Sequence, residues 1–392
     1  MRIGLVLPSL PGYSETFFKN KIKGLKENGH EVILYINNPS SNKKTYNGPV
    51  KYAPNLSENT ILRGFYSLVA LVNLVFFSFK STRRYYQLEK ADGSSFSKII
   101  KRLIINSHIL KCKLDWLHFG FATMGINREF VGKAIRAKVA VSFRGSDIYV
   151  YPIKNKNCYE KLWKNVDKIH TISDGLTHEA LLLGLEKKVP VVKITPAIDV
   201  KKYTIEKASL NRDKTIRILT VSRLHWIKGL EYALEALSLV KKAGYVVQYS
   251  IAGEGIEYEC LVFATHQLNL THEVAFLGKV AHDEIPSLMA SHDVYIQYSV
   301  QEGFCNAVLE AQAAGMLCIV SDAEGLSENV LHKKTGWVVP KRQPQLLAEQ
   351  ILNTMNMDNE VLDEIRVNAV ERMKKEFNIE KQKEEFERFY ST

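Results

Sequence analysis

A glycine loop flanked by two carboxylates is the part of this sequence best suited to chemistry. Glu302-Gly303-Phe304-Cys305-Asn306 follows a strand-like apolar run and precedes a helical pattern. Gly303 lets a ligand approach the backbone closely, and Asn306 is expected to cap a helix whose N-terminal amides attract anions. Glu310 falls inside that helix, eight positions after Glu302 and on the side of the loop. Two such carboxylates can accept hydrogen bonds from paired hydroxyls, although in isolation a loop acid and an exposed helix acid would be the simpler interpretation.

Two cations occupy an equivalent position earlier in the chain. Arg223 and Lys228 follow the strand-like run 217–221, where a helix is expected to begin. An arginine offers a planar fork to diphosphate oxygens, and a lysine offers a mobile point charge. A glycine turn, Gly253-Glu254-Gly255, follows the next apolar run. The carboxyl ends of parallel strands meet at one sheet edge, so we expect these groups to gather there, while either cation alone is more often a surface residue.

The elements that would position these groups alternate along nearly the whole chain. Short β-rich apolar runs such as 3–7 and 217–221 are followed by helical patterns such as 15–28 and 230–243. This alternation predicts the α/β class, with parallel sheets covered by helices on both faces. Right-handed crossovers would make each half a Rossmann-like, doubly wound domain. The first strand is not followed by G-x-G-x-x-G, which argues against an NAD enzyme.

A polar stretch after Pro196 marks the domain boundary, because the strand–helix rhythm restarts beyond it. The sequence predicts an N-terminal domain over 1–200, a linker over 201–214, a C-terminal domain over 215–375 and a C-terminal helix within 376–392. The apolar positions of that last helix are Phe386 and Phe389, which form a narrow stripe. Such a helix must dock on another surface to be stable.

Composition places the chain among ordinary globular proteins. Of its 392 residues, 46% are hydrophobic and 24% are charged, which excludes a disordered or fibrous chain. The five cysteines are scattered and lack a C-x-x-C pair, which disfavours both a disulfide framework and a zinc site. The apolar run at the start is too short for a secretory signal, so a cytoplasmic location is expected.

Charge is uneven along the chain and points to an anionic partner for its first half. Residues 1–200 hold 31 Lys and Arg against 15 Asp and Glu, whereas the remainder holds 22 against 27. Nucleic acid, a lipid surface and phosphorylated substrates would all fit, and so would a basic solvated surface without a partner. The basic residues are dispersed and lack a nucleic-acid-binding signature, so no nucleic-acid partner is expected.

Two segments of this half bear on a membrane surface. Gly64–Phe79 carries no formal charge, but it is short for a bilayer span, and a buried domain helix is the favoured interpretation. Ser95–Leu110 places its apolar residues on one helical face and Lys98, Lys101 and Arg102 on the other. A basic amphipathic helix suits an anionic membrane interface, and an ordinary half-buried helix has the same pattern. A peripheral position on the cytoplasmic membrane face therefore stays open.

Taken together, these stretches resemble the retaining glycosyltransferases of family 4, the glycosyl transferases group 1 family. The resemblance covers nearly the whole chain and is strongest from Ile216 to Pro340, through VSRLHWIKG, SIAGEGIE, VAFLGKV, YSVQEGFCNAVLEAQAAG, VSDAEGLSENV and TGWVVP. Glu302 and Glu310 fall on the family's E-x7-E pair, and the first half matches through LPSLPGYSETF, DWLHFG and VSFRGSDIY. The resemblance implies the GT-B fold, with two Rossmann-like domains facing across a cleft, and a nucleotide-sugar donor. It also implies that the C-terminal helix within 376–392 packs back on the N-terminal domain.

The resemblance implies a role for each matching residue of the second half. Arg223 and Lys228 would hold the donor diphosphate and its developing negative charge, and Glu310 would accept hydrogen bonds from the ribose hydroxyls. Glu302 would contact the transferred sugar. The other donor-binding positions are Gly253, Glu254, Gly255, Leu277, Gly278, Gly303, Phe304, Cys305 and Asn306. Catalysis is thus assigned to Glu302, Arg223 and Lys228, together with His118 of the first half.

In the first half, the resemblance implies residues that line the acceptor side: Gly12, Ser14, Glu15, Thr16, Arg144 and Asp147. His118 matches a family histidine that often contacts the sugar. The family frequently has a second histidine two positions later, where this chain has Gly120, and Arg144 stands where many relatives have histidine. Asp147 fits the family's G-x-D turn.

The implied reaction is transfer of a hexosyl unit with retention, from a UDP-sugar (favoured) or a GDP-sugar to a lipid-linked or polysaccharide acceptor in cell-surface glycan synthesis. We expect no cofactor and no metal, because the Arg/Lys pair can replace a divalent ion and no D-x-D motif is evident near these loops. The alternatives are a sugar phosphorylase or nucleotide-sugar epimerase of the same fold, and a non-catalytic scaffold that binds sugar nucleotides.

Overall fold

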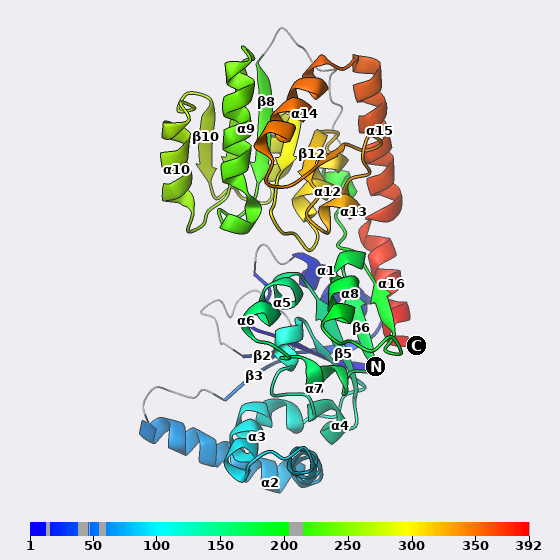
Figure 1. The fold of residues 1–392 in the computed structure, drawn as a ribbon. Coiled ribbons are helices and arrows are strands. Elements are labelled where there is room, and N and C mark those ends of the chain that lie inside the picture. Colours follow the sequence, from blue (N-terminus) through cyan, green and yellow to red (C-terminus); the bar gives the residue numbers. More distant parts are fainter. Residues whose placement is uncertain (13–15, 38–45, 47, 55–59, 204–214, 392) are drawn as a thin grey trace. The chain divides into compact units, whose positions relative to one another are not determined.

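The computed structural model describes residues 1–12, 16–37, 46, 48–54, 60–203 and 215–391. The chain divides into two compact units: unit 1 comprises Met1–Ile194 with Lys383–Thr392, and unit 2 comprises Thr195–Gln382. Each unit is built on its own parallel sheet (Figure 1). The predicted α/β class with two Rossmann-like domains is confirmed.

The ends of the two units differ in detail from the predicted domain bounds. Unit 2 begins at Thr195, inside the range 1–200 that was predicted for the N-terminal domain. Residues 204–214, most of the predicted linker, lie outside the described residues. The C-terminal helix is α16 (Ile379–Ser391), and its residues from Lys383 onward belong to unit 1.

Within its described residues, unit 1 contains a seven-stranded parallel sheet in the order β3-β2-β1-β4-β5-β6-β7. Its strands are β1 (Arg2–Leu7), β2 (Glu31–Ile36), β3 (Val50–Tyr52), β4 (Trp116–Phe119), β5 (Lys138–Phe143), β6 (Lys168–Thr171) and β7 (Val191–Lys193). The central strands are covered on both faces, which explains their continuous apolar runs. The order of the strands reverses between β1 and β4.

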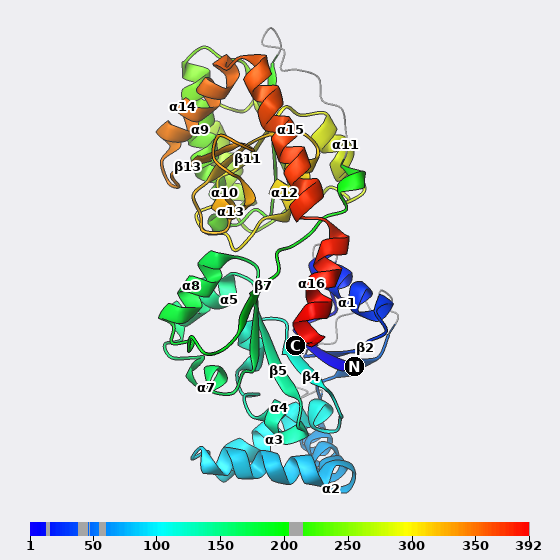
Figure 2. The ribbon, with the colours of Figure 1, turned by 90° about the vertical axis from the view of Figure 1, so that its right-hand side faces the viewer.

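Helices cover both faces of this sheet. They are α1 (Thr16–Glu27), α2 (Thr60–Ala91), α3 (Phe96–Leu110), η1 (Ala122–Gly125), α4 (Val131–Ile135), α5 (Ser146–Tyr149), α6 (Tyr151–Lys154), α7 (Glu160–Trp163) and α8 (Asp174–Leu182). Phe17 of α1 packs against Phe386 of α16, and Figure 2 shows the two helices side by side. The Trp116 indole N–H donates to the carbonyl of Tyr390 (3.2 Å). The narrow apolar stripe of the C-terminal helix is therefore buried on unit 1.

Within its described residues, unit 2 contains a six-stranded parallel sheet in the order β10-β9-β8-β11-β12-β13. Its strands are β8 (Ile216–Val221), β9 (Val247–Ala252), β10 (Val274–Gly278), β11 (Val294–Gln297), β12 (Leu317–Ser321) and β13 (Trp337–Val339). Here the order of the strands reverses between β8 and β11.

The helices of unit 2 also form two layers. They are η2 (Val200–Lys202), η3 (Trp226–Lys228), α9 (Leu230–Lys242), α10 (Tyr258–Gln267), α11 (Ile285–Ala290), α12 (Asn306–Ala313), α13 (Leu326–Asn329), α14 (Pro344–Asn356) and α15 (Asn359–Glu376). α9 packs against α10 and α14, and α12 packs against α15. Leu230, Leu234 and Leu237 of α9 recur at helical spacing and are buried in the core.

The prediction that Gly64–Phe79 forms a buried helix is wrong. The segment is helical, within α2, and the helix is broken at Ser78 (φ −146°, ψ 28°). Phe76 and Phe77 are 77% and 80% exposed, whereas Ala70 and Leu74 are buried. An apolar sequence shows that a helix could be buried, but other elements must cover it, and here they cover one narrow side.

The interpretation of Ser95–Leu110 as a half-buried helix is confirmed. Ile99 and Leu103 of α3 are buried. Arg102, which belongs to the expected basic face, is buried as well and forms an ion pair with Glu89 of α2 (2.5 Å). The packing of α3 against α2 therefore occupies part of the surface that a free amphipathic helix would offer to lipid.

Candidate active site

The loops that follow β8 and β11 meet at the carboxyl edge of the unit 2 sheet. β8 pairs with β11, with Ile218 opposite Val294. Doubly wound folds bind ligands where the strand order reverses, beyond the carboxyl ends of the strands. Arg223 and Lys228 lie in the first loop and Glu302 lies in the second. The fold therefore brings these predicted groups to its ligand-binding edge.

Backbone contacts hold the two loops against each other. The Val300 N–H donates to the carbonyl of Ile227 (2.8 Å). Gly229 has φ 59°, and a Cβ at this position would lie 2.3 Å from the carbonyl oxygen of Tyr298. A side chain there would push the loops apart. The placement of Lys228 relative to Glu302 thus depends on the neighbouring glycine.

Lys228 and Glu302 form an ion pair whose side chains are only 11% and 12% exposed. The Lys228 ammonium and the Ser299 hydroxyl (3.3 Å) both donate to Glu302 Oε2. Burial alone would lower the pKa of Lys228, but the Glu302 carboxylate outweighs burial, so this pKa lies above its usual value. Lys228 is therefore a charged and well-held cation.

Arg223 adds a second positive charge beside this pair. Its side chain is exposed, and its charge acts to lower the pKa of Lys228, which places the two cations within electrostatic range. Glu302 neutralises one of them, so the two loops present net positive charge. A diphosphate group, with several negative oxygens, fits such a pair.

Glu310 lies on α12, directly after the Glu302 loop, and its side chain is buried. Burial raises the pKa of Glu310 to about 7, and a hydrogen bond with Tyr203 acts in the opposite direction. This carboxyl therefore changes charge near neutral pH. The predicted cap is wrong: Cys305 is the N-cap of α12, without a side-chain cap hydrogen bond, and Asn306 is the first helical residue.

Three residues that the sequence analysis did not single out support this part of the site. Tyr203, inside the predicted linker, reaches Glu310. Asn329 of α13 accepts from the Cys305 N–H (3.0 Å) and donates to the Cys305 carbonyl (3.2 Å). Arg372 of α15 donates to the carbonyl of Asn329 (2.8 Å). All three act through tertiary contacts, and only Asn329 lay within a matching stretch, VSDAEGLSENV.

The Gly253-Glu254-Gly255 turn packs its backbone on the Arg223 loop. The Leu224 N–H donates to the carbonyl of Glu254 (2.9 Å), and the Gly253 N–H donates to the carbonyl of Gly278 (2.7 Å). A Cβ on Gly253 would lie 1.8 Å from the Ser222 carbonyl oxygen. The turn, Gly278 and the partly exposed Leu277 therefore lie at the same sheet edge as the cations.

The side chains of Phe304 and Cys305 are buried within unit 2, and burial raises the pKa of the Cys305 thiol to about 12. Gly303 is closely covered, because a Cβ on Gly325 would lie 2.0 Å from its carbonyl oxygen. For the positions 303–305, the predicted donor contacts are therefore restricted to the backbone.

The predicted acceptor-side residues lie in unit 1. Ser14 and Glu15 are outside the described residues. Gly12 precedes them in the loop after β1, and Thr16 follows them as the first residue of α1. The Arg144 guanidinium stacks 3.9 Å from the ring centroid of Phe17. These positions follow the carboxyl end of β1 or β5, as expected for a ligand-binding edge.

Asp147 has a structural role that replaces its predicted acceptor contact. Its carboxylate is buried and accepts hydrogen bonds from the backbone N–H groups of Ala122 (3.0 Å), Arg144 (3.0 Å) and Gly145 (2.9 Å). Three backbone donors hold this side chain in the turn that follows β5.

His118 is a core residue of unit 1, which corrects its predicted place in the catalytic set. Its side chain is 0% exposed. One ring nitrogen is hydrogen-bonded to the Tyr390 hydroxyl (2.5 Å) and the other to the Ser142 hydroxyl (2.7 Å). Burial lowers the pKa of His118 well below its usual value. The strand position was predicted correctly, but α16 covers this face of β4 and leaves the ring no free nitrogen.

We expect His118→Ala to destabilise unit 1 without a large change in the rate of the folded enzyme. Its removal takes a hydrogen-bond partner from the buried Tyr390 hydroxyl and from the buried Lys21 ammonium, and the loss of a buried partner costs about 1–3 kcal/mol for each group. Thermal unfolding, together with kcat and KM per folded molecule, separates the two effects. A loss of about a hundredfold in kcat at unchanged Tm would instead mark His118 as a substrate contact.

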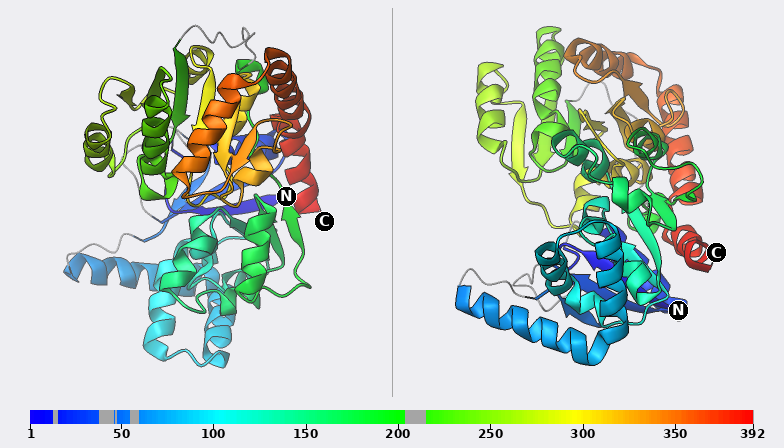
Figure 3. Two further views of the ribbon diagram at one scale, coloured as in Figure 1. Left: turned by 45° about the horizontal axis from the view of Figure 1, so that its top comes forward. Right: turned by 60° about the horizontal axis from the view of Figure 1, so that its bottom comes forward.

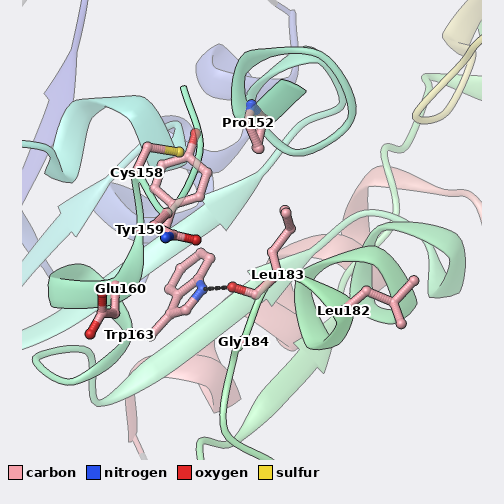
Figure 4. Close-up of a pocket in the computed structure, with 9 residues that line it drawn as sticks. Pro152, Cys158, Tyr159, Glu160, Trp163, Leu182, Leu183 and Gly184 are labelled. Atoms are coloured by element: carbon pink, nitrogen blue, oxygen red, sulfur yellow. Dashed lines mark hydrogen bonds between the residues drawn. The ribbon is translucent and has the colours of Figure 1, made fainter. Parts of the chain in front are cut away.

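A cavity of about 370 Å³ lies in unit 1. It lies between α7 and the end of α8 and is lined by Tyr159, Trp163 and Leu183, among others. Figure 4 shows Trp163 beside Leu183, whose carbonyl accepts the indole N–H (3.1 Å). None of the predicted site residues lines it. Across the described part of the chain, no group of three or more His, Cys, Asp or Glu side chains is placed to hold a metal ion.

Unit 2 is thus a Rossmann-type ligand-binding domain with a cationic group at the point where its strand order reverses. Residues 201–376 match the model of the family described as glycosyl transferases group 1. Over these residues the chain is similar to the group 1 glycosyltransferases.

Relatives extend the similarity beyond this domain. WcaL of Salmonella typhimurium, named as a colanic acid biosynthesis glycosyltransferase, is 24% identical over 396 residues that cover 96% of each chain. AmsK of Erwinia amylovora, an amylovoran biosynthesis glycosyltransferase, is 26% identical over 298 residues, 73% of this chain and 72% of AmsK. Among solved structures, Anabaena HepE in complex with UDP has a TM-score of 0.74 at 17% identity, covering 100% of this chain and 99% of HepE. The GT-B fold class is confirmed.

Proposed function

We propose that this protein is a retaining glycosyltransferase of family 4 that transfers a hexosyl unit from a UDP-sugar to a polysaccharide or lipid-linked acceptor in cell-surface glycan synthesis. The observation that carries the proposal is the Lys228–Glu302 ion pair, with Arg223 beside it, at the reversal point of the unit 2 sheet. Similarity to WcaL and AmsK supports a polysaccharide product. The UDP in the HepE complex supports a uridine nucleotide.

The cations fit the charge that develops in this reaction. The leaving group is a nucleoside diphosphate, and negative charge builds on its β-phosphate as the bond to the anomeric carbon breaks. Lys228 is already held by Glu302 and stays charged, so little reorganisation is needed when this charge develops. Donors that are fixed in advance favour the transition state over the ground state. Arg223 contributes the second cation, and Glu302 contacts the transferred sugar.

We expect the reaction to need neither a divalent metal nor a cofactor. Two cations at this sheet edge supply the charge stabilisation that a metal ion supplies in other phosphate chemistry. Transfer should therefore proceed at an unchanged rate after dialysis against EDTA. A rate that collapses with EDTA and returns with Mg²⁺ or Mn²⁺ would contradict this part of the proposal.

Glu310 should make nucleoside binding depend on pH. Only the ionised carboxylate accepts hydrogen bonds from both ribose hydroxyls. Burial raises the pKa of Glu310 to about 7, so we expect the affinity for uridine to rise about tenfold from about pH 6 to pH 8. Uridine is the probe because it lacks phosphates that titrate in the same range, and calorimetric titration gives its Kd.

The control for this experiment is Glu310→Gln, which has nearly the same shape and does not ionise. Its affinity for uridine should be weaker and independent of pH. A wild-type affinity that is flat between these pH values would remove Glu310 from the ribose site.

Product analysis separates the proposed function from the same-fold alternatives. A panel of UDP- and GDP-sugars identifies the donor as the one that raises Tm, since a ligand that binds the native state raises its apparent stability. Release of UDP that requires a glycan acceptor supports transfer. Conversion of the nucleotide sugar without an acceptor indicates an epimerase, dependence on inorganic phosphate indicates a phosphorylase, and binding without turnover indicates a scaffold.

A further inference from the structure

The first half of α2 presents a wide apolar surface to solvent. Ten large apolar side chains between Leu62 and Phe79 are at least 40% exposed, and both views of Figure 3 show this helix along the rim of unit 1. At about 100° per residue, these side chains span an arc of about 200°, opposite the buried Ala70 and Leu74. A helix on a globular protein usually turns an apolar stripe of roughly 100° inward. Here the wider apolar face is turned outward.

Positive charge borders this surface. Between Thr60 and Leu88 the sequence contains no Asp or Glu, and its charged residues are Arg63, Lys80, Arg83 and Arg84. Lys80 and Arg83 are exposed directly beyond the break at Ser78. On α3, Lys98, Lys101 and Phe96 are exposed as well. The apolar arc therefore has a basic border, with no acid between Thr60 and Leu88 to compensate it.

We propose that residues 62–79 bind the interface of an anionic lipid bilayer as an in-plane anchor. The apolar arc, with Phe76 and Phe77 at its most exposed part, would lie at the boundary of the acyl chains, about 5–10 Å deep. Lys80 and Arg83 would lie at the level of the lipid phosphates, where each cation strengthens binding. The anchor belongs to unit 1 and stands independently of the proposed transfer reaction.

The length and attachments of the helix favour an in-plane position over a membrane span. By length and composition alone, Leu62–Ala91 could cross a membrane. Its apolar part, 62–79, is about 27 Å long, which is shorter than a hydrocarbon core of about 30 Å. Leu74 is fully buried, and Arg84 donates to the carbonyl of Ala134 (2.7 Å). These contacts tie the helix to the body of unit 1.

A second copy of the chain fits this surface less well than lipid does. A symmetric dimer uses the same patch on both copies, so the basic border of each copy would face a surface whose charged residues are also basic. The patch itself carries no acid to pair with them, and like charges across an interface oppose binding. Lipid phosphates supply the missing negative charge.

Sedimentation of the full chain with vesicles tests the proposal. Vesicles of phosphatidylcholine alone are compared with vesicles that contain about 30% phosphatidylglycerol. The test variant is Phe76→Ser with Phe77→Ser, and the matched control is Ile153→Ser with Phe263→Ser, exposed apolar residues outside α2. A charge variant, Lys80→Glu with Arg83→Glu, is matched by Lys154→Glu with Lys156→Glu. All eight side chains are exposed, so the variants are expected to fold.

We expect the wild type to bind the anionic vesicles, and the Phe76/Phe77 variant to bind at least about tenfold more weakly. The Lys80/Arg83 variant should lose the preference for anionic lipid, and both controls should bind like the wild type. Equal binding by the wild type and the Phe76/Phe77 variant, or no binding by the wild type, would overturn the proposal. A wild-type dimer that this variant dissociates, without vesicle binding, would assign the surface to a second copy. Wild-type protein that resists extraction by alkaline carbonate would indicate a span and would also overturn it.

Discussion

Lys228→Ala is expected to lower kcat for sugar transfer about 10²–10³-fold, the effect typical of removing one fixed donor from a developing oxyanion. Glu302→Ala should reduce transfer by at least about tenfold, because it removes both the proposed sugar contact and the partner that holds the Lys228 ammonium. The measurement is acceptor-dependent UDP release at saturating donor. Saturation matters because it separates a loss in chemistry from a loss in donor affinity.

The matched control is Lys241→Ala. Lys241 of α9 also forms an ion pair, with Glu273 (2.6 Å), in the same unit, and its loss should leave the rate unchanged. Lys228 is nearly buried, so Lys228→Ala also affects the stability of unit 2. Arg223→Ala removes the second cation at an exposed position, so a loss of rate in this variant reports the loss of charge and not a loss of folding. Near-wild-type rates for Lys228→Ala and Glu302→Ala, in folded protein, would remove the proposed site.

Gly253→Ala is expected to destabilise unit 2 by about 3 kcal/mol or more, which corresponds to about 6–12 °C in Tm for a domain of this size. The backbone of Gly253 has φ 147°, and its Cβ would lie 1.8 Å from the carbonyl oxygen of Ser222. A backbone atom cannot rotate away as a flexible side chain can, so the loop that carries Arg223 must move. We therefore expect nucleotide affinity to fall together with stability, as measured by thermal unfolding with and without UDP.

Gly244→Ala separates backbone strain from crowding. Gly244 also has a positive φ (90°), but no atom lies within 4 Å of its Cβ position. Strain alone costs about 1 kcal/mol or somewhat more, so this variant should remain folded and bind UDP normally. Equal losses of stability for the two alanine variants would show that the contact with Ser222 is unimportant.

The fold and the main site residues could be predicted because their signals are local. Strand and helix periods are visible within each short segment, and parallel strands place their carboxyl ends at one edge. Arg223, Lys228 and Glu302 follow two such strands, and their meeting depends only on β8 and β11 being neighbours. The same reasoning located His118 on a strand, but it gave no information about what covers that strand.

The residues that were missed depend on segments far apart in the chain. Asn329 is hydrogen-bonded to the backbone of Cys305, and Tyr203, which lies in the predicted linker, is hydrogen-bonded to Glu310. The spacing of these residues along the sequence does not indicate either contact. The Cys305 N-cap was missed because its side chain makes no cap hydrogen bond, so the preference of Asn for the cap position gave the wrong residue.

The amino-acid sequence by itself determined the order of strands and helices, the two parallel sheets and the loops that carry charge, since hydrophobic period and chain chirality fix these locally. Only the tertiary structure decided which side chains are buried by other elements of the chain. α16 buries His118, burial gives Glu310 a pKa of about 7, and an uncovered side leaves the apolar face of α2 in solvent. Burial is a property of neighbours brought from elsewhere in the chain, and the identity of a residue does not specify which neighbours it will have.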